Sequence, residues 1–172
     1  SALESPAKMG FLLTLPEPPE LDPHAATVVL DRLQDAGNVG AILRSASAFG
    51  FKQVVAIKGT AGLWSTKVLR AGMGAHFGLQ LIESASAEHL QSLKIPLLGT
   101  DVHEGPYLHD LLKQGGLTQK CAWVMGHEGQ GVSAEIMALV TQKIRIAQPG
   151  GEESLNVAAA AAICLHASAT SM

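Results

Sequence analysis

The segment that decides the fold is residues 27–57, which read TVVLDRLQDAGNVGAILRSASAFGFKQVVAI. Two runs rich in β-branched residues, 27–31 and 53–57, flank a stretch with helical spacing of apolar residues over 39–49. A strand, a helix and a second strand in this order predict two parallel strands joined by a crossover helix. Asn38 stands where the loop enters the helix, and we expect it to be the N-cap.

The same alternation continues along the chain. Strands are expected over 79–82, 95–100, 121–126 and 143–146, and helices near 66–71, 87–93 and 134–140, with a last helix from about Leu155. This pattern predicts an α/β fold with a mostly parallel sheet and helices on both faces. Five of the eight prolines lie within residues 1–24, so we expect an extended linker or arm there, which a further N-terminal region could precede, and one domain over residues 25–172.

Charge is distributed unevenly along the 172 residues. Twelve Lys and Arg against 15 Asp and Glu give a net charge of −3, which argues against indiscriminate coating of nucleic acid. Residues 32–70 nevertheless sum to +5, so the remainder carries −8. A focused contact with RNA phosphates therefore remains open.

Several function classes find no support. Cys121 and Cys164 are too few for a disulfide framework and match no metal-ligand spacing, which fits a reducing cytoplasm. The seven histidines show no metal-ligand spacing either, so no metal is expected, and Asp101, His103 and Glu104 indicate a polar loop. Residues 154–172 carry no charge but are mostly Ala, which predicts a buried helix and not a membrane span.

Three motifs carry polar groups at predicted strand ends. In the first, Asp35 to Arg44, we expect Arg44 on the apolar face of a helix, where it needs either an ion-pair partner or an anionic ligand such as phosphate. The second, MGHEGQGVS at 125–133, presents Glu128 on a glycine-rich loop that lets a ligand approach the backbone, with Ser133 as the next N-cap. Its glycine spacing is not that of a dinucleotide-binding loop.

The third motif, IRIAQPGGEESLNV at 144–157, runs into five alanines. Ser154 or Asn156 is expected to cap the last helix, whose small residues permit close packing within the fold or against a second copy. Capping accounts for only one of these two polar residues.

Taken together, the motifs resemble the SpoU (TrmH-like) branch of the SPOUT RNA 2′-O-ribose methyltransferases. The matching patterns are N-x-G-x-x-x-R at Asn38 to Arg44, G-x-E-G-x-G at Gly126 to Gly131, and I-x-x-P…S-L-N-V at Ile146 to Val157, in an order and at distances that also fit. The resemblance covers about residues 27–168. Ala36 and His127 depart from the usual family residues, at positions the family does not use for chemistry.

The resemblance implies a SPOUT-type fold with a C-terminal trefoil knot that shapes a pocket for S-adenosylmethionine. Gly126, Ile146 and Leu155 match the positions that hold this cofactor, and Thr100 at the end of the fourth strand is added to them. Members of the family act as homodimers with the site near the interface, and their substrate is transfer or ribosomal RNA.

The resemblance also implies catalytic roles. Arg44 matches the family's catalytic arginine, and Asn38, Glu128, Ser154 and Asn156 match the remaining active-site positions. Arginine is not deprotonated in proteins, so a bound phosphate oriented by Arg44 is the easier proton acceptor for the ribose 2′-hydroxyl. Asn38 and Asn156 are expected to orient Arg44 and the ribose, and Glu128 to hold the loop or an opposing dipole.

Two alternatives stand beside an RNA 2′-O-methyltransferase. One is an RNA-binding module of the same fold that has lost catalysis, against which the joint presence of Asn38, Arg44, Glu128 and Asn156 argues. The other is an unrelated α/β nucleotide-binding enzyme, which the glycine-rich strand ends alone support.

Overall fold

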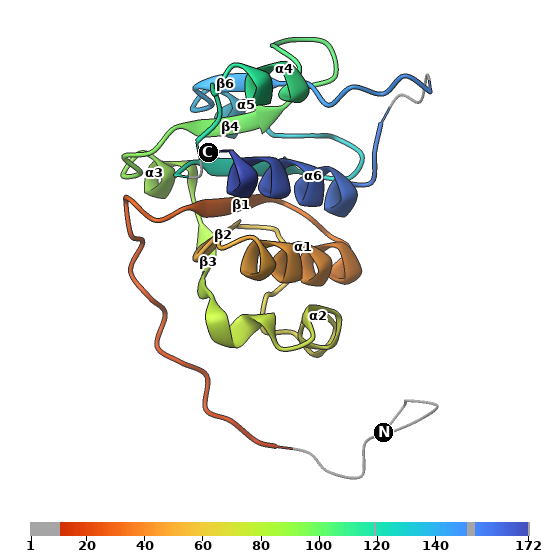
Figure 1. The fold of residues 1–172 in the computed structure, drawn as a ribbon. Coiled ribbons are helices and arrows are strands. Elements are labelled where there is room, and N and C mark those ends of the chain that lie inside the picture. The colour runs from red at the N-terminus through yellow and green to blue at the C-terminus, as the bar shows by residue number, and fades with distance from the viewer. Residues whose placement is uncertain (1–10, 119, 151–153, 172) are drawn as a thin grey trace.

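Six parallel strands form the central sheet of the structure, a computed structural model that describes residues 11–118, 120–150 and 154–171 (Figure 1). The strands are β1 (Thr27–Asp31), β2 (Gln53–Ile57), β3 (Gln80–Ala85), β4 (Leu97–Thr100), β5 (Ala122–Gly126) and β6 (Gln142–Ile144). Their order across the sheet is β3-β2-β1-β5-β4-β6, and every pair is parallel. The parallel sheet predicted from the sequence is therefore confirmed.

Helices cover both faces of this sheet, as expected for buried parallel strands. They are α1 (Ala36–Ala48), α2 (Thr66–Gly72), α3 (Ala87–Leu90), α4 (Leu108–Lys113), α5 (Ala134–Met137) and α6 (Val157–Thr170), with a 3-10 turn η1 at Ala75–Gly78. One core cluster joins the sheet to α1, α2, α4 and α6, and a second joins its other face to α3 and α5. In Figure 1, α6 lies alongside α1 in front of the sheet.

The central strands and the last helix are tied together by a buried polar contact. Trp123 on β5 is fully buried, and its indole Nε1 donates to Ser168 Oγ of α6 at 2.8 Å. Cys121 and Cys164 are both buried and form no disulfide, and burial raises the pKa of the Cys121 thiol to about 11. Both thiols therefore belong to the core.

The differences from the sequence prediction lie at element ends. The last helix begins at Val157, two residues after Leu155, and the sixth strand ends at Ile144, which leaves Ile146 in the following loop. The helices predicted over 87–93 and 134–140 are shorter, at Ala87–Leu90 and Ala134–Met137, and α4 and η1 were not predicted.

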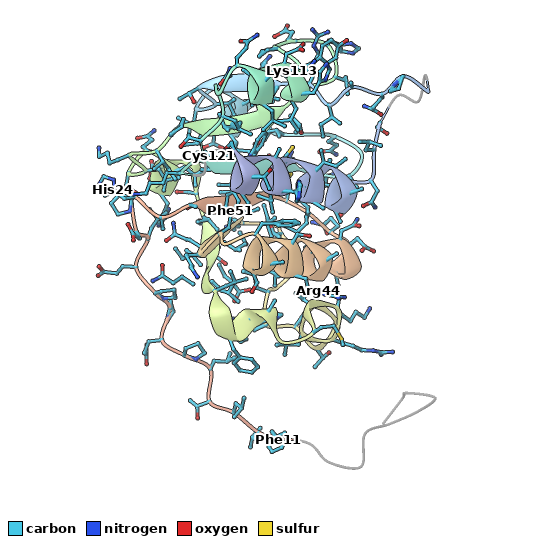
Figure 2. The ribbon with its side chains drawn as sticks, in the orientation of Figure 1. Phe11, His24, Arg44, Phe51, Lys113 and Cys121 are labelled. Atoms are coloured by element: carbon cyan, nitrogen blue, oxygen red, sulfur yellow. The ribbon has the colours of Figure 1, made fainter. Side chains whose placement is uncertain are left out.

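Residues 11–21 form no helix or strand and run away from the sheet, with Phe11 at their far end (Figure 2). The chain joins the body at Asp22, whose N–H donates to Gln53 Oε1 at 2.8 Å. Within the described ranges, no helix combines the length and the hydrophobicity that crossing a membrane requires.

Candidate active site

The chain passes from β1 to β2 toward one edge of the sheet and from β5 to β6 toward the other edge, so the direction of winding changes between β1 and β5. In open α/β sheets, ligands bind at such a point, outside the carboxyl ends of the strands. A cavity of about 850 Å³ lies at this edge, bordered by the loops after β4, β5 and β6 and by the first turns of α1 and α6. The strand register places Asp31 beside Gly126 there.

Almost all of the site residues predicted from the sequence meet around this cavity. Its lining includes Asn38, Thr100, Gly126, Glu128, Ile146, Ser154, Leu155 and Asn156. The fold thus brings together three motifs that are separated by up to 118 positions in the sequence. Residues 151–153 of the third motif, part of the Gly-Gly-Glu-Glu loop, lie outside the described residues.

A chain of side-chain hydrogen bonds links the three motifs. Asn156 Nδ2 donates to Asn38 Oδ1 at 3.0 Å, and Asn38 Nδ2 donates to Glu128 Oε1 at 3.3 Å. Asn156 Oδ1 also accepts the backbone N–H groups of Ala158 and Ala159, at 2.9 and 3.2 Å. The Glu128 carboxylate at one end of this chain only accepts hydrogen bonds, and the α6 backbone N–H groups at the other end only donate them. The side-chain amides of Asn38 and Asn156 can therefore each have only one orientation.

Glu128 holds the start of α1 against the glycine-rich loop. Its two carboxylate oxygens accept the backbone N–H groups of Gln34 and Asp35, at 3.2 and 3.1 Å, besides the Asn38 amide. Burial alone raises the pKa of this carboxyl, but hydrogen bonds from its own backbone, from Asp35, Gln34 and from Asn38 outweigh burial and lower it. Glu128 is therefore anionic at neutral pH.

Asn38 is not the N-cap of α1, which corrects the sequence prediction. Asp35 has the extended backbone of the cap, and its Oδ1 accepts the Asn38 N–H at 2.7 Å. Asn38 lies one turn inside the helix, so its side chain is free to bridge Glu128 and Asn156. At α6 the cap is Asn156 and not Ser154.

The loop from His127 to Val132 is shaped by backbone contacts that demand glycine. A Cβ on Gly126 would lie 2.3 Å from the backbone atoms Gly131 C and Val132 N. His127 and Gly131 exchange two backbone hydrogen bonds, at 3.0 and 2.8 Å. Ser133 is the N-cap of α5 as predicted, but its side chain makes no capping bond, and its N–H donates to the buried carboxylate of Asp31.

Arg44 is the one predicted site residue that does not reach the cavity. It is exposed on α1 and not buried on the apolar face, so that expectation was wrong, and no ion pair involves it within the described chain. It lines a separate recess of about 500 Å³ with Lys67 and Arg70 of α2. Figure 2 shows Arg44 on the side of α1 that faces α2.

Three further residues of the cavity were missed by sequence reasoning. Asp101 and His103, expected only as a polar loop, line its mouth, and a hydrogen bond from the His103 backbone lowers the pKa of Asp101. Gln148 also lines it, and its Oε1 is buried without a hydrogen-bond partner among the described residues. No sequence motif singles out Gln148; only its buried Oε1 without a hydrogen-bond partner among the described residues identifies it in the structure.

The remaining wall is apolar, formed by Met125, Val132, Met137, Val157 and Ala160. Within the described ranges, no three His, Cys, Asp or Glu side chains gather as metal ligands. An apolar wall with a few convergent polar groups is typical of a small-molecule site. Fold and site thus define a parallel α/β domain with a cavity of the small-molecule kind at the carboxyl edge of its sheet.

Comparison with known proteins places this domain in a family. Residues 25–166 match the family model of the SpoU rRNA methylases, and the chain belongs to that family. It is 30% identical over 166 residues to a Bacillus subtilis protein named 23S rRNA (guanosine(2553)-2′-O)-methyltransferase RlmP. The aligned region covers 95% of this chain and 65% of that relative.

Solved structures agree. A TrmH-family protein from Porphyromonas gingivalis superposes with a TM-score of 0.78 at 34% identity, over 89% of this chain and 62% of that one. The SpoU methyltransferase AviRb from Streptomyces viridochromogenes, solved in complex with AdoMet, superposes with a TM-score of 0.73 at 27% identity, over 87% of this chain and 61% of that one. The chain spans less than two thirds of the length of each of these relatives.

Proposed function

We propose that this chain is the catalytic domain of an S-adenosylmethionine-dependent enzyme that methylates a ribose 2′-hydroxyl of ribosomal or transfer RNA. The observation that carries the proposal is the meeting of all three motifs around one cavity, tied by the hydrogen bonds from Asn156 through Asn38 to Glu128. Relatives named as 2′-O-methyltransferases of ribosomal RNA support the same activity.

The cavity fits S-adenosylmethionine in its chemistry. Its apolar wall suits the adenine ring, and the orphaned Gln148 Oε1 is an acceptor for an amino group of the cofactor. Gly126, Ile146, Leu155 and Thr100 would hold the cofactor, largely by backbone groups at the strand ends. When bound, S-adenosylmethionine supplies an electrophilic methyl group on a sulfonium, so the protein needs no covalent intermediate.

The chain's own residues then position the ribose and the group that accepts its proton. Asn38 and Asn156 are held rigidly between Glu128 and the α6 amides, and their edges face the cavity as hydrogen-bond partners for ribose hydroxyls. Glu128 is already engaged by three N–H donors, so it orients the site and does not take the proton. Ser154, exposed at the mouth, is a further partner for the RNA. A substrate phosphate held by Arg44 is the proton acceptor.

Arg44 acts in this scheme across a homodimer interface. The described lining of the cavity contains no Lys or Arg, and Arg44 of the same chain lies in the other recess. A second copy, packed against the Ala-rich face of α6 where Ile163 is exposed, would supply the missing cation. We further propose the family's trefoil knot for the C-terminal segment, and a cytoplasmic location, which the two buried cysteines that form no disulfide support.

Two measurements test the function. Calorimetry should show binding of S-adenosylmethionine, and transfer of a radiolabelled methyl group to unmodified ribosomal or transfer RNA should be lost in Arg44→Ala. A wild-type chain that fails to bind S-adenosylmethionine would refute the proposal. Binding without transfer would favour the second candidate, an RNA-binding module without catalysis.

A mixture of inactive chains tests the interface. A dimer of one Arg44→Ala chain and one Gly126→Ala chain contains one intact cavity, which faces an intact Arg44 only if the arginine acts across the interface. Random pairing would then restore about one quarter of the wild-type activity. No restored activity in a mixture shown to exchange subunits would place Arg44 and the cavity in the same chain.

A further inference from the structure

The recess between α1 and α2 gathers three cations that no carboxylate balances. Arg44, Lys67 and Arg70 line it with Ala71 and Met73, and all three cations are exposed. In residues 11–118, 120–150 and 154–171, none of the three forms an ion pair. Like charges held together in this way repel each other unless an anion binds between them.

The packing of the two helices forces the cations together. A Cβ on Gly40 would lie 2.4 Å from Ala71 Cβ and 2.7 Å from the Ala71 backbone carbon, so the helices touch at this crossing. Arg44 follows Gly40 by one helical turn, and Lys67 precedes Ala71 by one turn. Arg70 is the direct neighbour of Ala71. A close crossing between two small residues therefore places all three side chains around one recess.

We infer that Lys67 and Arg70 bind phosphates of the substrate RNA strand next to the methylated nucleotide. The inference rests on the proposed function, in which Arg44 holds one phosphate of that strand. Lys67 and Arg70 line the same recess as Arg44, so phosphates that flank the one on Arg44 fall within their reach. An RNA loop or single strand is the partner that fits, because proteins reach splayed-out nucleotides there and not inside a duplex.

The charge distribution of the chain supports an anionic strand on this side. The three cations supply half of the six basic residues in the +5 segment 32–70. Exposed Met73, in a left-handed backbone conformation at the end of α2, adds an apolar surface at the rim. Lys113 lies at the opposite end of the molecule in Figure 2 and serves as a control cation outside the recess.

The test measures RNA affinity against salt for a fluorescein-labelled, 20-nucleotide single-stranded RNA of mixed sequence. The variant is Lys67→Ala/Arg70→Ala, and the matched control is Lys94→Ala/Lys113→Ala, which removes two exposed cations elsewhere. Loss of two phosphate contacts should lower the slope of log affinity against log salt by about 1.4 and weaken binding about tenfold at low salt. The control variant should leave both the salt slope and the affinity close to those of the wild type.

Both variants should bind S-adenosylmethionine as the wild type does, which shows that the cavity is intact. An unchanged salt slope in the recess variant, or an equal loss in the control, would overturn the inference. Wild-type protein that lacks cofactor binding and methyl transfer would instead refute the proposed function, since the RNA titration does not require either. Lys67→Arg/Arg70→Lys should restore affinity, because it keeps both charges.

Discussion

Replacing Asn156 tests how one residue can both cap a helix and join the site. Asn156→Ala removes two capping bonds to α6, at 2.9 and 3.2 Å, and the 3.0 Å bond to Asn38. Loss of an N-cap costs about 1 kcal/mol. The bond to Asn38 adds about 0.5 kcal/mol, the low end of its range because Asn156 is exposed. We therefore expect a loss of about 1.5 kcal/mol, which lowers the Tm by about 3–6 °C in a chain of this length.

Asn156→Asp separates the two roles. Aspartate caps as well as asparagine, and its charge is favourable at a helix N-terminus, so stability should stay within about 0.5 kcal/mol of wild type. It cannot donate to Asn38, however, and it places a carboxylate against the Asn38 oxygen. The amide of Asn38 then cannot satisfy both this carboxylate and Glu128. Methyl transfer should fall about tenfold, equivalent to about 1.4 kcal/mol in the barrier.

Urea denaturation and radiolabelled methyl transfer measure the two effects side by side. The reasoning is refuted if the aspartate variant is as unstable as the alanine variant, since capping would then not be the source of stability. It is equally refuted if the aspartate variant transfers methyl groups at the wild-type rate, because the bond to Asn38 would then play no part in the site.

Three more outcomes follow from the geometry. Gly126→Ala drives a Cβ into backbone 2.3 Å away, so it should destabilise the chain by about 1–3 kcal/mol and abolish cofactor binding in calorimetry. Gln148→Met keeps the side-chain volume but removes the orphaned acceptor, and should weaken cofactor binding about fivefold, with unchanged affinity contradicting the assignment. The pKa of Glu128 is lowered in the folded state, so its stabilising effect is complete above about pH 4.3 and is lost as the pH falls through the folded pKa. The stability gap between wild type and Glu128→Gln should therefore be constant from pH 6 to 8 and shrink in acid, and a gap that changes near pH 7 would contradict it.

The sequence predicted the central strands well because each of them is a short run of mostly β-branched or apolar residues. Buried parallel strands keep such runs on both faces, as TVVLD and QVVAI do with all residues buried. Helix ends were harder. At the start of α1, both Asp35 and Asn38 are residue types that cap helices well. Asp35 is the cap, and Asn38 instead connects Glu128 of a distant loop to Asn156, which the sequence of α1 alone does not reveal.

The candidate site could be predicted as a set of residues but not as a geometry. The resemblance of the motifs to the SpoU family placed Asn38, Glu128 and Asn156 in one site, and all three line the cavity. The same resemblance placed Arg44 with them, although Arg44 lies beside the close crossing of Gly40 on Ala71 and lines the recess with α2. Helix periodicity reports which face is apolar, and it does not report which second helix covers that face. Gln148 could not be predicted as a site residue for a related reason, since burial of its Oε1 depends on loops that are far apart in the sequence.

The arrangement of charge gives the cavity and the recess opposite electrostatic preferences. The described lining of the cavity holds the carboxylates of Glu128 and Asp101 and no Lys or Arg, and Lys143 forms ion pairs with both Asp101 and Glu104. This cavity is therefore net negative, which favours a ligand that carries a positive sulfonium and disfavours a free nucleoside phosphate. The recess on α1 and α2 holds three unpaired cations and favours the opposite charge. A chain with a net charge of −3 can thus favour a cation at one site and a polyanion at another, because the close crossing of α1 and α2 gathers Arg44, Lys67 and Arg70 in a recess separate from the cavity.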